Sequence, residues 1–257
     1  MTDLFIPGLT DPDAVATVRR HGHSGEAATR QAEAVFDQLE AALAASGGTR
    51  ADVCKITMHI TDRAWRQPVY GVLGKRLSGV FPVSTGLIVN GLAHPDALFQ
   101  LDAYAVHGGP HERFRRYRSG DAPYGLHKQS FSMEFCMAVR AGRRVFLRGQ
   151  TGSTLDRRFP HLNDPAAQAH QAIANVQELL RDAGADLSHA TRLVAYVTDR
   201  AYLEPVLAAV LPAFPAPPAC TELMVKGLAA PELLMEIDVH ATLPGPGPAA
   251  TAPRVSA

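Results

Sequence analysis

The strongest constraint on the fold of this chain is that its sequence repeats itself. The segment KITMHITDRAWRQPV, which begins at Lys55, matches RLVAYVTDRAYLEPV, which begins at Arg192, 137 residues later. Further on, TGLIVNGLAHPDALFQLDAYA from Thr85 matches TELMVKGLAAPELLMEIDVHA from Thr221, 136 residues later. A repeat at one spacing indicates two copies of one structural unit, and the second copy is one residue shorter between these blocks.

Apolar periodicity predicts the elements of each unit. A helical stripe in the first copy recurs 137 residues later in the second, and a glycine, Gly47 or Gly184, follows each stripe. The stripes consist of Ala32, Val35, Phe36, Leu39 and Leu43, and of Ala169, Ala172, Ile173, Val176 and Leu180. Alternating segments predict strands at 53–60, 87–89 and 101–106, and at 190–197, 223–225 and 234–241. Short second helices are expected at 65–77 and 202–211.

The second copy also begins with a hairpin that turns at 140–142, whereas the first copy has only residues 4–10 in its place and lacks the first strand. The predicted fold is α+β, with two tandem units that are each a mostly antiparallel sheet with two helices on one face. We expect the first unit at 1–106, a linker at 107–126, the second unit at 127–243 and a disordered tail at 244–257.

Composition argues against several classes of partner. Lys plus Arg and Asp plus Glu are both 25, so no net charge favours nucleic acid or an anionic membrane. The Arg-rich run at 111–120 is expected to be a solvated connector. The three cysteines lack metal-ligand spacing, and His21 with His23 has no further ligand nearby, so we expect no metal. Without a signal peptide or a long apolar run, the chain is expected to be a soluble cytoplasmic protein.

The segments that mark the repeat also resemble the Rid (YjgF) family of enamine and imine deaminases. In the second copy they are GQTG at 149, VTDR at 197, FPAPPACTELMV at 214 and LLMEIDVHA at 233. In the first copy they are ITDR at 60, FPVSTGLIV at 81 and LFQLDAYA at 98. The resemblance implies a chorismate-mutase-like fold without a cofactor, trimers, and small-molecule pockets between neighbouring subunits. A fused pair then predicts a homotrimer that is a pseudo-hexamer of repeats.

The resemblance also carries roles onto individual positions. The family's arginine that grips a substrate carboxylate falls on Ser84 and Cys220, and its water-positioning glutamate falls on Gln100 and Glu236. The family's pocket asparagine falls on Tyr70 and Leu207, the serine before Gly-Gln on Arg148, and the first-strand tyrosine on Phe135. We therefore expect a substrate-binding set that consists of Arg148, Gly149, Gln150, Phe135 and Leu207.

The residues themselves suggest two kinds of chemistry. Glu222 and Glu236, if close together, make an acid/base pair, because one carboxylate raises the pKa of the other. Cys220 is a candidate nucleophile if His240 lowers its thiol pKa, although a lone cysteine is more often a small buried hydrophobe. The expected catalytic residues are Glu236, Cys220 and Glu222. Arg148 either supplies positive charge to the pocket or pairs with a surface carboxylate.

Three functions follow from this sequence. The first is a divergent Rid-type hydrolase or deaminase that acts on a small polar enamine, imine or amide, with the first copy mainly a scaffold. The second is a non-catalytic small-ligand-binding or structural protein. The third is an enzyme like the chorismatases, which also resemble fused Rid-like units.

Overall fold

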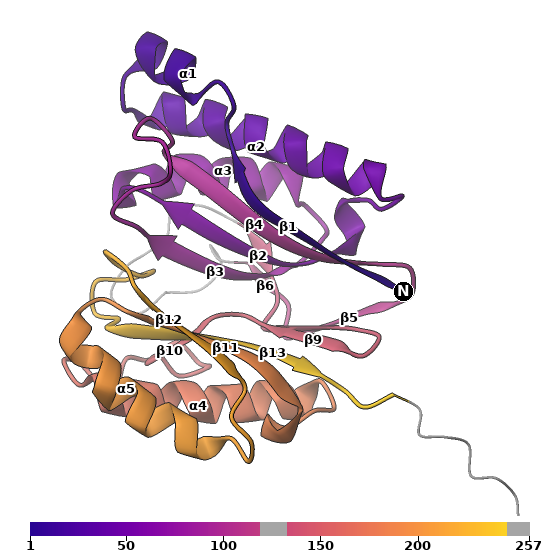
Figure 1. Ribbon diagram of the computed structural model, residues 1–257, viewed down its shortest axis with the longest axis vertical. Coiled ribbons are helices and arrows are strands. Elements are labelled where there is room, and N and C mark those ends of the chain that lie inside the picture. Colours follow the sequence, from indigo (N-terminus) through magenta and orange to yellow (C-terminus); the bar gives the residue numbers. More distant parts are fainter. Residues whose placement is uncertain (119–132, 246–257) are drawn as a thin grey trace, which may run out of the picture.

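The computed structural model describes residues 1–118 and 133–245 of the 257-residue chain. Two β-sheets face each other in the middle of the molecule, and helices cover the outer side of each sheet (Figure 1). The first repeat forms one half of this four-layer stack and the second repeat forms the other half. Each sheet therefore packs its own helices on one face and the other repeat on the opposite face.

The first repeat folds around a sheet of four strands in the order β1-β4-β2-β3, in which β2 and β3 run parallel and the other neighbours run antiparallel. Its strands are β1 (Thr2–Thr10), β2 (Val53–Ile60), β3 (Val83–Ile88) and β4 (Phe99–His107). Its helices are α1 (Ala14–His21), α2 (Gly25–Ala45) and α3 (Arg66–Arg76).

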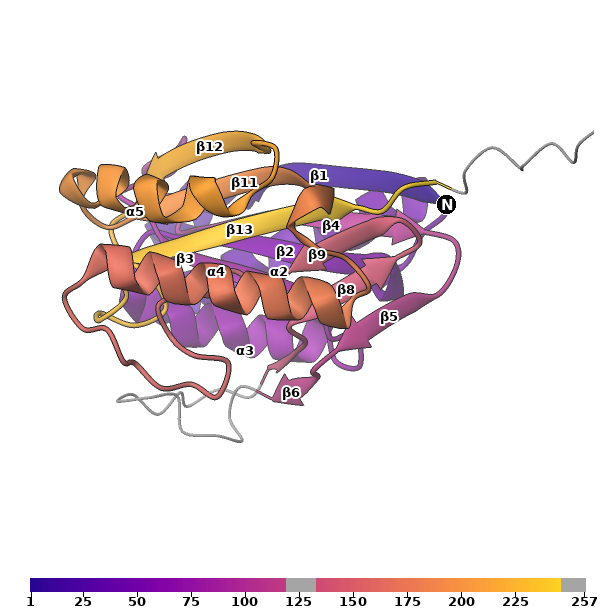
Figure 2. The same ribbon diagram turned by 90° about the horizontal axis from the view of Figure 1, so that it is seen from below.

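The second repeat has the same arrangement with additional strands. Its sheet runs β12-β11-β13-β9-β8-β5 among the described residues, and the short β10 also pairs with β13. The strands are β8 (Ala138–Ala141), β9 (Arg144–Leu147), β10 (Gln150–Thr151), β11 (Ala190–Val197), β12 (Ala219–Met224) and β13 (Met235–Thr242). The helices α4 (Pro165–Asp182) and α5 (Leu203–Val210) cover its outer face, as Figure 2 shows.

The helix ends have local causes. The Ser24 hydroxyl accepts a hydrogen bond from the Ala27 amide at the start of α2, and the Asp164 carboxylate accepts one from the Ala167 amide at the start of α4. After each helix the chain turns through a glycine with a left-handed backbone, Gly47 at φ 77° and Gly184 at φ 75°. The two long helices thus end where the sequence predicts.

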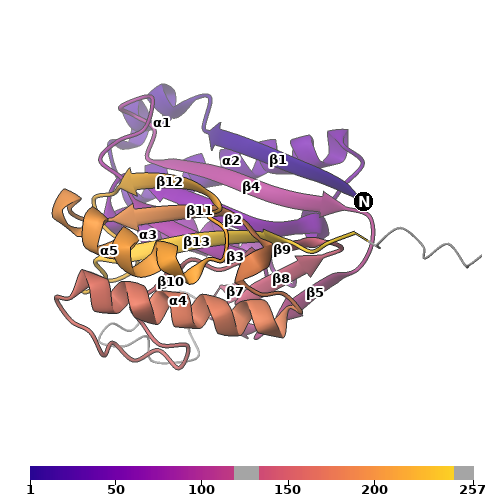
Figure 3. The ribbon, with the colours of Figure 1, turned by 60° about the horizontal axis from the view of Figure 1, so that its bottom comes forward.

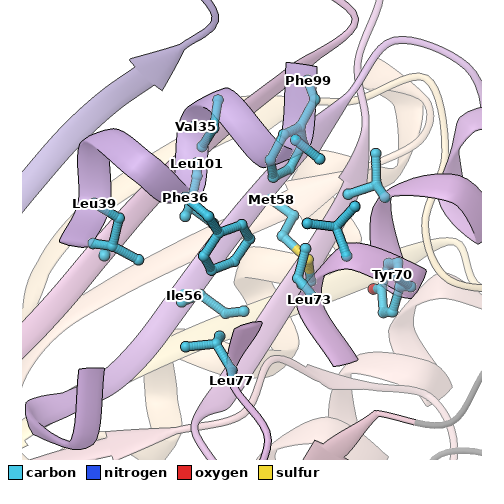
Figure 4. Packing of buried hydrophobic residues seen from close by; sticks show 14 of the residues in the cluster. Val35, Phe36, Leu39, Ile56, Met58, Tyr70, Leu73, Leu77, Phe99 and Leu101 are labelled. Carbon is cyan, nitrogen blue, oxygen red and sulfur yellow. The ribbon is translucent and has the colours of Figure 1, made fainter. Parts of the chain in front are cut away.

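The core of the first repeat lies between α2, α3 and the sheet. Phe36 and Leu39 of α2 pack on Ile56 and Met58 of β2, and Leu73 of α3 closes the cluster (Figure 4). These side chains are wholly buried, because β2 alternates its apolar positions toward the helices and α2 repeats its own at helical spacing. The second repeat builds an equivalent core from α4, α5, β11 and β13.

The inner faces of the two sheets form the interface between the repeats. Val83 of β3 packs with Phe146 of β9 in one apolar cluster, and Leu87 packs with Val194 and Tyr196 of β11 in another. Ile88 also pairs with Gly227 through an amide-to-carbonyl hydrogen bond of 2.8 Å. The sheet face left uncovered by a unit's own helices is thus covered largely within one chain (Figure 3).

Some elements differ from the sequence expectation. Helix α1 is additional, and β5 (His111–Phe114) lies inside the expected linker, where it extends the second sheet by pairing with β8. A short pair, β6 (Tyr117–Arg118) with β7 (Glu134–Phe135), follows. The rest of the expected linker, 119–126, and positions 246–257 of the expected tail lie outside the described residues.

Candidate active site between the repeats

A cavity of about 510 Å³ lies at the junction of the two repeats and is lined by both. The first repeat contributes residues of α3, β3 and the turn that precedes α3: Arg63, Arg66, Gln67, Tyr70, Ser84 and Gly86. The segment that leads into the second repeat contributes Arg115, Arg116 and Tyr117. The second repeat contributes, among others, Phe135, Arg148, Gly149, Gln150, Arg157 and Glu236. A cavity of this volume is suited to a small metabolite.

Glu236 enters the cavity from β13. Successive side chains of a strand point to opposite faces, so Ile237 and Val239 join the core while Glu236, Asp238 and His240 face the first repeat. Thr151 of β10 and Tyr196 of β11 are its neighbours across the strands. The Glu236 side chain is almost completely buried, although its residue type is mostly found in water.

Gly149 makes room for this carboxyl group. A Cβ atom at position 149 would lie 1.8 Å from Glu236 Oε1 and 2.7 Å from Glu236 Cδ. The Gly149 amide donates a hydrogen bond to the Ser84 carbonyl, 3.2 Å away, which joins the backbones of the two repeats at the same point. The glycine of the Gly-Gln sequence is therefore required by close contact with Glu236.

The surroundings of Glu236 favour its protonated form. Burial and, after it, the neighbouring Asp238 carboxylate raise the pKa of Glu236 to about 8. Arg148, Lys55 and Arg66 act in the opposite direction and lower this pKa. The net effect is a carboxylic acid that holds its proton at neutral pH inside a ligand-sized cavity.

The wall of the cavity is strongly basic. Among the described residues that line it, six are arginines and Glu236 is the one acid. Arg66 donates a hydrogen bond to the Ala229 carbonyl at 2.8 Å and lies over the Tyr70 ring at 5.2 Å, and Arg148 lies over the Tyr117 ring at 5.6 Å. Arginines on several walls suit a ligand that carries a carboxylate, because guanidinium groups pair with carboxylates through parallel hydrogen bonds.

Most of the site residues inferred from sequence line this cavity. Arg148, Gly149, Gln150, Phe135 and Glu236 do so together. The Gln150 side chain donates a hydrogen bond to the Arg148 carbonyl at 2.7 Å, and the Gly149 amide is bonded to Ser84. Both groups therefore shape the wall around Glu236.

Three inferred residues lie elsewhere. Cys220 and Glu222 are exposed on β12, where Cys220 Sγ and Glu222 Oε1 are 3.8 Å apart, and neither lines the cavity. Burial, followed by Glu222, raises the pKa of the Cys220 thiol, the opposite of what a nucleophile needs. Leu207 lies on α5 in a shallow hollow on the outer side of the second repeat.

These three residues lie outside the cavity because the cavity combines strand residues of one repeat with a helix and a strand of the other. Strand positions around Glu236 come from the second repeat, but the neighbouring helix and strand come from the first. Tyr70 and Ser84, the first-repeat counterparts of Leu207 and Cys220, accordingly line it. The first repeat is thus half of the site and not only a scaffold.

Sequence reasoning also missed the charged part of the wall. Arg63 is the arginine of the repeated Thr-Asp-Arg-Ala segment, and Arg66 follows that segment. Arg115, Arg116 and Tyr117 belong to the Arg-rich run that we expect from sequence to be a solvated connector. In that run a tyrosine stands among arginines, and this pattern was the sequence signal that could have indicated a ligand-binding wall. The repeated aspartates have a local role instead, since Asp62 and Asp199 accept hydrogen bonds from the amides of Ala64 and Ala201.

No metal-binding group appears within 1–118 and 133–245, where no three His, Cys, Asp or Glu side chains are gathered suitably. His21 lies 3.3 Å from a Glu26 carboxylate oxygen and His23 lies 3.4 Å from one of Asp96, so the two histidines point to different partners. In the same part of the chain, no helix has the length and apolar character needed to cross a membrane.

Solved structures with the same fold include a chorismatase, which matches 93% of this chain and 75% of its own with a TM-score of 0.66 and 18% sequence identity. A Rid-family protein of unknown function from Yersinia pestis is 33% identical over 42% of this chain and 86% of its own, with a TM-score of 0.38. A YjgF-family protein from Mycobacterium tuberculosis is 28% identical over 52% of this chain and 100% of its own, with a TM-score of 0.41. A search of curated proteins found no match.

The second repeat also matches a protein-family model. The model is that of the endoribonuclease L-PSP family, and it matches residues 128–243. The chorismatase match extends over 93% of this chain and therefore over both repeats. The family-model match, together with the identity to the Yersinia pestis relative, shows that this chain belongs to the Rid (YjgF) family and carries two copies of the family unit in tandem.

Proposed function

We propose that this protein is a hydrolase that binds a small carboxylate-bearing enamine or imine between its repeats and uses Glu236 as the acid. The observation that carries the proposal is the buried Glu236 carboxyl group, with its pKa raised to about 8, in an arginine-lined cavity. An acid with a pKa near the working pH is an effective proton donor. The basic wall favours a substrate that carries a carboxylate. Ser84 stands where the family has its carboxylate-binding arginine, and Arg66 and Arg148 supply the positive charge in its place.

The reaction of a 2-aminoacrylate illustrates the chemistry. Glu236 gives its proton to the terminal methylene carbon, where the electron pair of the carbon–carbon double bond forms the new C–H bond and leaves an iminium group. The Glu236 carboxylate then takes a proton from water as the water oxygen adds to the iminium carbon. The carbinolamine expels ammonia, to which Glu236 returns the proton while it accepts the hydroxyl proton, and a keto acid remains.

Glu236→Gln tests the acid, because glutamine keeps the shape and cannot donate the proton. We expect kcat to fall at least about 100-fold on the best substrate from a panel of imines, enamines and amides. The matched control is Glu222→Gln, the same change on the exposed strand β12, and Cys220→Ala is a second control. Both controls are expected to keep full activity.

Two results would contradict the proposal. Full turnover by Glu236→Gln would show that Glu236 is not the catalytic acid. The absence of turnover on every substrate of the panel, combined with binding of small carboxylates in calorimetry, would favour the non-catalytic ligand-binding function.

The chorismatase fold supports a second candidate, which the same panel tests by including chorismate. The enolpyruvyl ether of chorismate is also a 2-substituted acrylate, so protonation of its methylene carbon followed by water addition uses the same acid. Loss of an alcohol then replaces loss of ammonia. Hydrolysis of chorismate without activity on enamines would favour this candidate over the first.

The assembly and location are also proposals. We propose a homotrimer, supported by the exposed apolar side chains on β12, and a cytoplasmic location. Sedimentation of the purified chain tests the assembly, and a stable monomer at micromolar concentration would contradict it. The cavity between the repeats is formed within one chain, so the proposed reaction does not require the trimer.

A further inference from the structure

A buried lysine lies next to the proposed acid without lining the cavity. Lys55, on β2 of the first repeat, is completely buried, and its Nζ lies 2.5 Å from Asp238 Oδ1 on β13 of the second repeat. Removing two charges from water is costly, so such a pair persists where its geometry and its other hydrogen bonds are satisfied. A contribution to stability is therefore not enough to explain why the Lys55–Asp238 pair is buried here.

All three donors of the Lys55 ammonium are used. Nζ donates to Asp238 Oδ1 at 2.5 Å, to the Leu147 carbonyl at 3.0 Å and to Thr85 Oγ1 at 3.1 Å. Asp238 and Leu147 belong to the second repeat, whereas Thr85 belongs to the first. Lys55 thus fixes β13 and the end of β9 of one repeat against β2 and β3 of the other.

These contacts converge on Glu236. Asp238 is two residues from Glu236 on the same face of β13. Thr85 Oγ1 and Glu236 Oε1 both lie against Gly149, at 2.8 Å and 1.8 Å from the position of a Cβ atom there. The lysine, its hydroxyl partner and the carboxyl group are therefore parts of one packed cluster.

The charged and titratable groups around Glu236 come from several elements. Asp238 is on its own strand, Tyr196 on β11, Lys55 on β2 and Arg66 on α3, while Arg148 follows β9. Asp238 raises the pKa of Glu236, and Lys55, which is paired with Asp238, lowers it. The effect of Asp238 on Glu236 is larger than that of Lys55.

We propose that Lys55 and Asp238 form a positioning pair that holds the Glu236 carboxyl group against Gly149. As charged neighbours of Glu236, the two residues also set the pH range over which it keeps its proton. The first repeat thereby controls the acid of the second. The catalytic consequence of this role rests on the proposed function, but the control of the proton does not. Neither Lys55 nor Asp238 lines the cavity.

The test follows the proton on Glu236 directly. Infrared difference spectra between each protein and the same protein carrying Glu236→Gln report the C=O stretch of the protonated carboxyl group as pH rises. The midpoint is expected at about pH 8 in the natural chain. Asp238→Asn should lower it by about one unit or more, because a like charge is removed and Lys55 remains.

Asp238→Asn leaves the Lys55 charge buried without its partner, and that variant could fail to fold. A double variant keeps the test decisive in that case. Lys55→Met with Asp238→Leu replaces the ion pair by apolar groups, a change that buried pairs often tolerate. Its midpoint should lie below that of the natural chain but above that of Asp238→Asn. The matched control is Asp3→Asn, which removes the partner of Arg144 in an exposed ion pair that also joins the two repeats. Its midpoint should equal that of the natural chain.

The alkaline limb of the kcat profile should move with the infrared midpoint in each variant. The four proteins are the natural chain, Asp238→Asn, the double variant and Asp3→Asn. The same infrared midpoint in all four would overturn the positioning role, even if Glu236→Gln is inactive. Midpoints in the expected order would support that role even if Glu236→Gln is fully active, which would reject the proposed function alone.

Discussion

At position 149 a hydrogen atom is the largest substituent that fits beside the Glu236 carboxyl group. A Cβ atom there would meet Glu236 Oε1 at 1.8 Å and Thr85 Oγ1 at 2.8 Å. Thr85 Oγ1 accepts a hydrogen bond from Lys55, and the Glu236 side chain is buried, so a methyl group at position 149 forces both side chains to shift within a packed region. The glycine therefore couples the shape of the backbone to the position of the acid.

Gly149→Ala is expected to destabilise the protein by about 1–3 kcal/mol, the usual range for forcing a methyl group into a packed site. It should also reduce activity, because Glu236 must shift. Chemical denaturation measures the stability, with Gly71→Ala as the control. Gly71 lies in α3 with open space at its Cβ, and alanine is the better helix former there. Equal stability of the two variants would contradict the close packing at Gly149.

Residue by residue, the sequence located the strand side of the candidate site better than the helix side. Glu236 and Arg148 could be read from the order of the family segments around them. Cys220 and Leu207 are the second-repeat copies of two family positions, whereas the cavity is lined by the first-repeat copies, Ser84 and Tyr70. No sequence pattern states which copy's helix packs beside Glu236, since that depends on how the two sheets meet.

At the scale of elements, β3 and β12 are the same strand of the repeat in opposite environments. Leu87 of β3 is 1% exposed because it packs against the second repeat, whereas its counterpart Leu223 of β12 is 45% exposed. Met224 beside it is 61% exposed. An exposed apolar edge strand is a typical place for another chain to bind.

Leu87→Ala should cost about 2–5 kcal/mol, the range for truncating a buried leucine, and Leu223→Ala less than about 1 kcal/mol. Thermal or denaturant unfolding of the two variants is a matched comparison, since both remove the same atoms from equivalent strands. A large loss for Leu223→Ala that depends on protein concentration would indicate that another copy covers β12, as the proposed trimer requires.

At the scale of the whole molecule, the two repeats share the interface that buries Glu236, Lys55 and Asp238. Because the pKa of Glu236 is raised in the folded chain, its contribution to stability is complete below its ordinary value near 4.5. That contribution is lost as pH rises through about 8. The loss is on the order of a few kcal/mol.

Glu236→Gln should remove this dependence. The melting temperature of the natural chain, relative to that of the variant, is expected to fall by several degrees, roughly, between pH 4.5 and pH 8 and then to level off. Scanning calorimetry across this range measures the difference, in which the titration of other groups cancels. Parallel melting curves at all pH values would show that Glu236 titrates normally.

The sequence by itself determined the duplication, the α+β fold and the long helices, because apolar spacing and glycine positions act locally and recur in both copies. It did not determine the strand β5 within the expected linker, because its partner β8 lies beyond that linker in the sequence. It also did not determine α1, which packs on the neighbouring α2. The tertiary structure alone decided that the site is built crosswise, with arginines of the first repeat around an acid of the second. The reason is physical: burial, close contact and charge at Glu236 arise from the packing of one sheet on another, which no local pattern encodes.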